Sequence, residues 1–209
     1  VRMLGAHNRQ SRTTGLISIL VDGGGCLDAG SVTTALTLEE QRRVRALLLT
    51  HRHYDHILGV ATLGMNRAGT EAVGVFAPAE VLEELTAHVI NGTLYPRLDE
   101  RTSLGEATLS LTAVEVLREF DAGGYRVVAT PMPHGVPAVG YQVTGPDGAS
   151  VFYTGDTMGG LDAAWQAAAP QLLIAEVTLP NRLRGTSKHM AAADLEEELR
   201  RCQVMKGTL

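Results

Sequence analysis

The hydrophobic positions of this chain fall mostly into short apolar runs, and many of these runs are separated by turn residues such as Gly, Pro, Asn and Asp. Runs bounded in this way are typical of β-strands that are buried on one or both faces. An Asp-Gly-Gly turn at residues 22–24 favours a hairpin between two of them. On this basis we predict strands at residues 1–5, 16–21, 25–28, 46–50, 73–77, 108–111, 125–130, 139–144, 150–154 and 172–177.

Apolar residues at helical spacing predict helices at residues 38–45, 78–89, 161–169 and 190–204. Thr37 and Glu40 have the spacing of a capping box at the start of the first helix. The arginines on that helix are interpreted as a solvated face. The last helix carries Leu195 and Leu199 on one apolar face. Two strand-rich halves that each carry helices, with few long linkers, predict a single two-sheet sandwich over residues 1–209.

Potential metal-binding side chains are most concentrated directly after the apolar run 46–50, where residues 51–56 read His-Arg-His-Tyr-Asp-His. In an extended loop His51 and His53 project to the same side and can share one metal ion. Asp55, which we expect to cap a helix through residues 57–60, turns away with His56 and can reach a second ion. Imidazole and carboxylate without a nearby Cys suit Zn²⁺, Mn²⁺ or Fe. A solvated polar loop is the plain alternative.

Composition narrows the class of protein. The chain has 209 residues, is 44% hydrophobic and carries a formal net charge of −5. An acidic balance disfavours a broad nucleic-acid-binding surface, although a local basic patch stays open. The two cysteines, Cys26 and Cys202, are far apart in the sequence and are expected to be reduced thiols. We find no membrane span and no signal-peptide pattern, so we expect a cytoplasmic enzyme. Because the chain begins with Val1, we expect a few residues to precede it.

The run His-x-His-x-Asp-His after an apolar strand resembles the metal signature of the metallo-β-lactamase superfamily. This resemblance implies an α/β fold, the four-layer αββα sandwich. The segment Asp28-Ala29-Gly30 is similar to the Asp-x-Gly of that superfamily, in which the carboxylate supports the metal-binding loop. A plain turn residue is the alternative for Asp28.

Two later segments complete the expected site. His134 ends a strand between two prolines, and it is the natural third ligand beside His51 and His53. The residues around it, 134–141, resemble the phosphodiesterase branch of the superfamily. Thr154-Gly155-Asp156-Thr157 matches the superfamily's Thr-Gly-Asp-Thr, which implies that Asp156 bridges two ions. An ordinary turn residue is the alternative for Asp156.

The segment from Glu176 to His189 looks like class II cyclic nucleotide phosphodiesterases and, more distantly, tRNase Z. Both carry a strand that ends in Glu, then a loop, then a His at the start of the next helix. The resemblance implies that His189 contacts the scissile phosphate or protonates the leaving oxygen instead of binding metal. A histidine without a role at a helix start is the alternative.

Together these features predict a dinuclear metal-dependent hydrolase of small phosphodiesters such as cyclic nucleotides. Its two divalent ions, with Zn favoured and Mn or Fe as alternatives, would activate water for attack on phosphorus. The expected catalytic residues are His189, Asp55 and Asp156. The first expected metal site consists of His51, His53 and His134. The second consists of Asp55 and His56, and Asp156 bridges the two.

Three alternatives stay open. One is a lactone, β-lactam or thioester hydrolase of the same fold, because loops rather than fold decide the substrate. A second is a tRNA 3′-processing endonuclease, which the acidic composition and the absence of a long basic insertion disfavour. A third is a non-catalytic metal- or nucleotide-binding module. A flavodiiron oxidoreductase is disfavoured, because that family has an acidic residue where His53 stands. The oligomeric state is not fixed by the sequence, and a homodimer is one expectation.

The resemblance also calls for one more ligand. The superfamily places a last metal-binding His on a strand after the helix that follows His189. The sequence given stops at Leu209, where Lys206-Gly207 reads as the end of that helix. We therefore expect the native chain to continue through an apolar strand that ends in a metal-binding His. Without that residue, the second metal should bind more weakly than the first.

Overall fold

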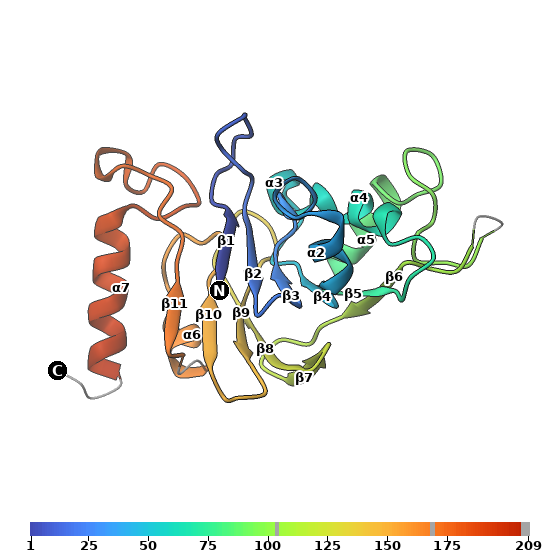
Figure 1. Cartoon of the computed structure of the whole chain (residues 1–209). Helices are drawn as coiled ribbons and strands as arrows, with labels where there is room; N and C mark the ends of the chain where they lie inside the picture. The colour runs from blue at the N-terminus through green and yellow to red at the C-terminus, as the bar shows by residue number, and fades with distance from the viewer. Residues whose placement is uncertain (103–104, 168–169, 206–209) are drawn as a thin grey trace. The chain divides into compact units, whose positions relative to one another are not determined.

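The computed structural model describes residues 1–102, 105–167 and 170–205, and divides into two compact units, Val1–Val114 and Glu115–Leu209. Each unit contains one β-sheet with its own helices (Figure 1). None of the described helices is long and apolar enough to cross a membrane.

The first unit holds a six-stranded sheet in the order β1-β2-β3-β4-β5-β6. Its strands are β1 (Arg2–Gly5), β2 (Ser18–Val21), β3 (Gly25–Leu27), β4 (Ala46–Leu48), β5 (Val73–Ala77) and β6 (Leu109–Ala113). The predicted hairpin is confirmed, since β2 and β3 pair antiparallel around a turn in which Asp22 and Gly23 have φ of 49° and 73°. From β3 to β6 the strands run parallel. The carboxyl ends of β3 and β4 therefore lie at the same edge of the sheet.

Helices cover one face of this sheet. They are α1 (Val32–Ala35), α2 (Leu38–Arg43), α3 (Tyr54–Ile57), α4 (Gly59–Asn66) and α5 (Ala79–His88). The shared core includes Leu47 and Val75 of the sheet and Val60, Leu63 and Leu85 of the helices. Burial of such side chains is the main favourable contribution to the stability of this unit.

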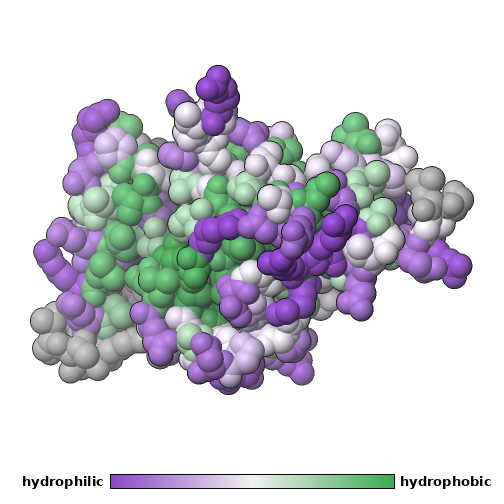
Figure 2. Space-filling view, viewed as in Figure 1, coloured by the Kyte–Doolittle hydropathy of each residue, from purple (hydrophilic) through white to green (hydrophobic). Residues whose placement is uncertain are grey.

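The predicted capping box of α2 is present, and the helix presents a hydrophilic outer surface that includes Arg42 and Arg43 (Figure 2).

The prediction that Asp55 caps a helix is wrong. The chain turns directly after His53, which stands at the cap position of α3 without a side-chain cap hydrogen bond. Asp55 consequently lies inside the first helical turn.

The second unit holds a five-stranded sheet in the order β11-β10-β9-β8-β7. Its strands are β7 (Glu119–Ala122), β8 (Tyr125–Pro131), β9 (Val139–Thr144), β10 (Ser150–Tyr153) and β11 (Leu172–Ile174). Strand β11 pairs parallel with β10, and the other pairs are antiparallel. The predicted strand at 172–177 was too long, because the chain leaves the sheet after Ile174 and Glu176 accepts hydrogen bonds from other loops.

The helices of the second unit are α6 (Asp162–Ala167) and α7 (Ala192–Met205), with a short 3₁₀ turn, η1 (Asn181–Leu183). Phe152, Trp165 and Met190 belong to its core. The predicted apolar face of α7 was partly wrong. Leu195 packs against this core, but Leu199 is exposed and Glu198 is buried instead. Predictions that fell on residues 168–169 and 206–207 lie outside the described residues.

Candidate metal centre

The motif residues of the first unit stand where β4 ends. Thr50 and His51, which follow β4, are fully buried, and so is Asp28, which follows the neighbouring strand β3. Because β3 and β4 are parallel, both segments leave the sheet at one edge. Binding residues are commonly mounted at the carboxyl ends of parallel strands.

The carboxylate of Asp28 holds this loop together. It accepts the Thr50 backbone N–H at 2.8 Å and the Thr50 hydroxyl at 2.9 and 3.0 Å. It also lies 2.7 Å from Nδ1 of His56, which places the ring proton on that nitrogen. Nε2 of His56 is then unprotonated and can bind a metal. The expectation that Asp28 supports the motif is confirmed in its geometry.

The glycine of Asp-x-Gly has a steric explanation. A Cβ added to Gly30 would lie 2.1 Å from the backbone oxygen of Asp55, far inside van der Waals contact. Only glycine lets the two loops approach this closely. Asp28 itself has φ of 54°, a left-handed conformation that Asp and Asn tolerate better than most residues.

Donor atoms in the motif form two pairs. Nε2 of His51 lies 2.9 Å from Nδ1 of His53, and Nε2 of His56 lies 3.7 Å from Oδ2 of Asp55. Nδ1 of His51 lies 3.0 Å from the Thr50 hydroxyl, which itself donates to Asp28, so Nε2 of His51 is the ligating nitrogen. Ligand atoms around one tetrahedral zinc are about 3.3 Å apart, given bonds of about 2.0–2.1 Å. Both separations are close to this value, and nitrogen and oxygen donors suit a borderline divalent ion.

The second unit presents another set of donor atoms. Nδ1 of His134 donates to the backbone oxygen of Lys188 at 2.9 Å, which leaves Nε2 as the nitrogen that can bind a metal. This Nε2 lies 4.0 Å from Oδ2 of Asp156. Both side chains are largely buried, since His134 is 2% exposed and Asp156 15% exposed. The loop after β8 and the loop after β10 therefore bring two predicted ligands together.

Glu176 and His189 form a pair beside Asp156. Oε1 of Glu176 lies 3.1 Å from Nδ1 of His189, and Nδ1 of His189 lies 3.7 Å from Oδ2 of Asp156. Ligand atoms of the three residues lie within 4.8 Å of one another. Glu176 also accepts backbone N–H groups from Thr157, Thr178 and Met190 at 2.9–3.2 Å. With four donors on its carboxylate, Glu176 is suited to orient His189 rather than to bind a metal.

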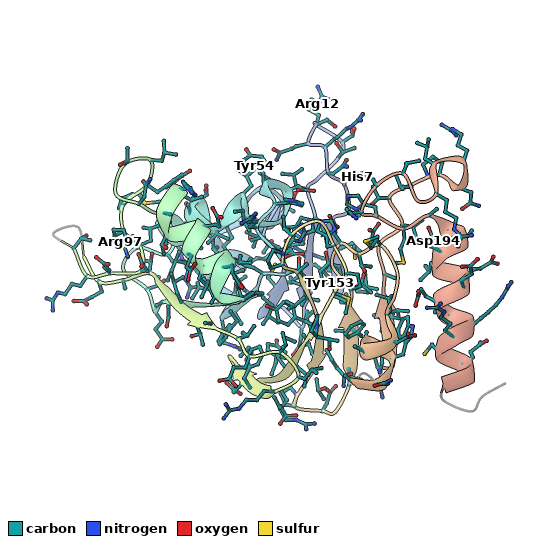
Figure 3. The ribbon with its side chains drawn as sticks, turned by 180° about the vertical axis from the view of Figure 1, so that it is seen from behind. His7, Arg12, Tyr54, Arg97, Tyr153 and Asp194 are labelled. Atoms are coloured by element: carbon teal, nitrogen blue, oxygen red, sulfur yellow. The ribbon has the colours of Figure 1, made fainter. Side chains whose placement is uncertain are left out.

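The two remaining histidines have other surroundings. His7 lies at the base of the long loop between β1 and β2, and Arg12 lies at its tip (Figure 3). The backbone N–H of His7 donates to Gly15. His88 is exposed on α5 and lies 3.2 Å from Glu84. Among the described residues, neither histidine belongs to the groups of donor atoms named above.

Comparison with known proteins identifies the family. Residues 19–208 match the family described as the Beta-lactamase superfamily domain. The chain belongs to the metallo-β-lactamase superfamily. This confirms the predicted fold and the resemblance on which it rested. The fold of the superfamily implies divalent metal ions, and the donor atoms of both units fit that requirement.

One curated relative and two solved structures illustrate the relationship. A Ribonuclease Z of Kineococcus radiotolerans is 27% identical over 169 residues, which are 73% of this chain and 51% of the relative. The chain thus spans about half the length of that relative. Unliganded yeast PDE1 superposes with a TM-score of 0.79 at 14% identity, covering 97% of this chain and 82% of that one. Human tRNase Z, short form, superposes with a TM-score of 0.69 at 20% identity, covering 96% of this chain and 88% of that one.

Proposed function

We propose that this member of the superfamily is a dinuclear metal-dependent hydrolase of phosphodiesters, with small ones such as cyclic nucleotides as its substrates. The observation that carries the proposal is the pair of Glu176 and His189 beside Asp156. It adds an oriented imidazole to a carboxylate that can bind metal. A phosphodiester needs such a group when its leaving oxygen must be protonated.

The proposed ligands follow the donor pairs. His51, His53 and His134 would bind the first ion. Hydrogen bonds to Nδ1 of His51 and of His134 leave Nε2 as the ligating nitrogen of each ring, and Nδ1 of His53 lies 2.9 Å from Nε2 of His51. Asp55 and His56 would bind the second, and Asp156 would bridge. Zinc fits this donor set best, with manganese or iron as alternatives. When bound, such ions supply Lewis acidity toward a phosphoryl oxygen and toward water.

The proposed role of His189 is to deliver a proton. Its Nδ1–H donates to Glu176, so an additional proton on Nε2 would make an imidazolium that the adjacent carboxylate stabilises. Nε2–H would give that proton to the leaving oxygen as the P–O bond breaks. A side chain that is 25% exposed can reach a bound substrate in this way.

Processing of tRNA 3′ ends is the second candidate, and the curated relative named Ribonuclease Z favours it. The formal net charge of −5 counts against it, because binding of structured RNA relies on cationic contacts to phosphates. A lactone, β-lactam or thioester hydrolase is the third candidate, because loops rather than the fold decide the substrate.

A substrate panel separates these candidates. Zinc- and manganese-loaded protein would be assayed with bis-p-nitrophenyl phosphate, a cyclic nucleotide, a lactone, a chromogenic cephalosporin and a tRNA precursor. We expect hydrolysis of the first two at rates well above the others. Preferred cleavage of the lactone or the cephalosporin would contradict the proposal. Salt-sensitive cleavage of the tRNA precursor alone would select the second candidate. A cytoplasmic location and a homodimer stay predictions.

A further inference from the structure

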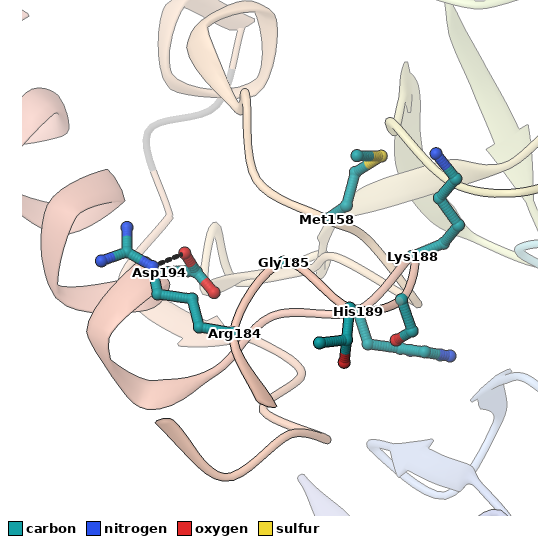
Figure 4. Close-up of a pocket in the computed structure, with 8 residues that line it drawn as sticks. Met158, Arg184, Gly185, Lys188, His189 and Asp194 are labelled. Atoms are coloured by element: carbon teal, nitrogen blue, oxygen red, sulfur yellow. Dashed lines mark hydrogen bonds and ion pairs between the residues drawn. The ribbon is translucent and has the colours of Figure 1, made fainter. Parts of the chain in front are cut away.

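We propose that a pocket next to His189 binds a second phosphate group of the substrate, through the ammonium group of Lys188. This inference rests on the proposed phosphodiesterase activity and names its substrate more closely. The pocket has a volume of about 240 Å³ and is lined by Met158 and by residues 184–189 and 194 (Figure 4). All of these residues belong to the second unit.

Most of the charge in this pocket is already paired. Nε of Arg184 donates to Oδ1 of Asp194 at 2.5 Å, and its NH2 group donates to Glu197 at 2.6 Å. These two carboxylates raise the pKa of the Arg184 guanidinium above its ordinary value. The second oxygen of Asp194 accepts the backbone N–H of Ala191. These contacts fix the loop onto the start of α7, and the Arg184 guanidinium, paired with two carboxylates, offers no positive charge to a ligand.

Lys188 is the cation that remains. Among the described residues its ammonium makes no hydrogen bond or ion pair, and Figure 4 shows its side chain extending away from the pair of Arg184 and Asp194. The sequence has two lysines, Lys188 and Lys206, beside sixteen arginines. An ammonium on a flexible stem acts as a mobile point charge for phosphate, whereas a paired guanidinium is held in place.

The base of this side chain is fixed even though its end is mobile. The backbone oxygen of Lys188 accepts the His134 ring proton, and its Cγ lies 3.4 Å from the Cβ position of Gly135. The neighbouring residue in sequence is His189. The ammonium is therefore tethered between a predicted metal ligand and the predicted proton donor. A phosphate held there would lie close to the scissile bond.

Met158 suggests what carries this phosphate. Its side chain is 43% exposed although it is large and apolar, and it lines the same pocket. Flexible thioether side chains pack well against aromatic rings. A nucleoside that bears a second phosphate would satisfy both the apolar surface and the ammonium. The inferred substrate class is therefore a nucleoside phosphodiester with an additional phosphate, and a plain cyclic nucleotide would use only part of the site.

Ligand binding tests this inference without requiring turnover. Metal-loaded protein would be titrated calorimetrically with thymidine 3′,5′-bisphosphate and with each of the two thymidine monophosphates. We expect the bisphosphate to bind about 10- to 100-fold more tightly than either monophosphate, because one additional hydrogen bond between charged groups contributes a binding free energy of this order. Lys188→Met should remove most of this difference, and Lys188→Arg should retain part of it.

Arg182→Met is the matched control, since Arg182 lies on the same exposed loop but does not line the pocket. It should keep the preference for the bisphosphate. Equal binding of bisphosphate and monophosphates to the unaltered protein would overturn the inference. Equal losses in Lys188→Met and Arg182→Met would also overturn it, because the effect would then be general electrostatics. Hydrolysis of bis-p-nitrophenyl phosphate, measured in parallel, reports separately on the proposed function.

Discussion

Hydrogen bonds at the candidate site select which ring nitrogen of each histidine carries a proton. Asp28 selects Nδ1 of His56, and the backbone oxygen of Lys188 selects Nδ1 of His134. Glu176 does the same for His189. In each case Nε2 is the nitrogen that remains for chemistry. Such supporting groups usually matter for metal affinity and activity nearly as much as the ligands themselves.

The role of His189 predicts a dependence on the leaving group. His189→Ala should keep the metal content but lower kcat for phosphodiesters by about 10²- to 10⁴-fold, as is typical for a lost general acid. Nitrophenyl esters should lose less than alkyl or nucleoside esters, because nitrophenolate leaves without a proton. Rates for a series of leaving groups, with elemental analysis of the same samples, check this. Equal losses on good and poor leaving groups would exclude proton donation.

The buried carboxylate of Asp28 predicts a selective effect on metal binding. Asp28→Asn keeps the size of the side chain, and asparagine also tolerates the left-handed backbone at this position. The substitution weakens the hydrogen bond that orients the His56 ring. We expect the affinity of the more weakly bound ion to fall by about 10- to 100-fold. Competition with a chromophoric chelator measures this. Asp22→Asn, in the exposed turn of the same unit, is the control and should bind metal normally. Unchanged affinity in Asp28→Asn would show that Asp28 does not orient a ligand.

At this scale the sequence predicted the residue types but only part of the geometry. His51, His53 and His56 could be found because three histidines lie within six residues. The contact of Lys188 with His134 could not, since it uses a backbone oxygen 54 residues away. The role of Glu176 was also missed, because it depends on where β11 ends. The resemblance marked Glu176 only as the end of a strand and assigned it no role.

Among the elements, the start of α2 predicts a measurable dependence on pH. The Thr37 backbone N–H, and after it the Arg2 guanidinium, lower the pKa of Glu40 from 4.5 to about 2. Because the folded-state pKa is lowered, the Glu40 carboxylate stabilises the fold above about pH 4.5. That contribution is lost as the pH falls toward about 2.

Glu40→Gln should therefore be less stable than the unaltered protein at pH 7, and the difference should shrink below pH 4. Thr37→Ala removes the other half of the capping box, whose hydroxyl accepts the Glu40 N–H at 3.2 Å. It should cost about 1 kcal/mol at neutral pH. Urea unfolding at several pH values checks both variants, with Glu39→Gln as the control on the same helix. If the free energy of unfolding of Glu40→Gln differs from that of the unaltered protein by the same amount from pH 7 to pH 3, the Glu40 carboxylate does not stabilise the fold in this way.

Strand β3 offers a second probe, the thiol of Cys26. Burial raises its pKa from 9.0 to about 12, and its Sγ donates to the backbone oxygen of Asp28. Since the folded-state pKa is raised, the unfolded chain loses the proton first, and stability falls between about pH 9 and pH 12. In this pH range the free energy of unfolding of the unaltered protein should fall more steeply with pH than that of Cys26→Ala, by roughly 1.4 kcal/mol per pH unit. Parallel slopes of the two proteins in urea titrations would contradict this.

The elements that the sequence missed share a physical cause. Strand β7 contains Glu119 and Asp121 on an edge of its sheet, where charge is tolerated and the apolar pattern is weak. On α7 the buried position belongs to Glu198, which accepts N–H groups from Gly160, Leu161 and Trp165. A charged residue that is satisfied by distant donors cannot be recognised from spacing alone.

At the scale of the molecule, the fold was predictable because one short motif implied it. The run at residues 51–56 and the strand-rich pattern together pointed to the superfamily that the comparison confirmed. Finer choices depend on loops, and these differ between relatives that share the fold. The acidic net charge of −5 counts against a long nucleic acid as substrate. The Lys188 ammonium, for which the described part of the chain offers no ion pair, lines a pocket that can take a small anion.

We propose above all that this chain is a metal-dependent hydrolase of phosphodiesters and that His53 and Asp156 are among its metal ligands. The most direct test is the metal content of three proteins: the unaltered chain, His53→Ala from the first unit and Asp156→Ala from the second. Elemental analysis should give up to two ions per chain for the unaltered protein and fewer for each variant. Hydrolysis should be lost in both variants while circular dichroism stays unchanged. Full metal content in His53→Ala and Asp156→Ala, both still folded, would contradict the account.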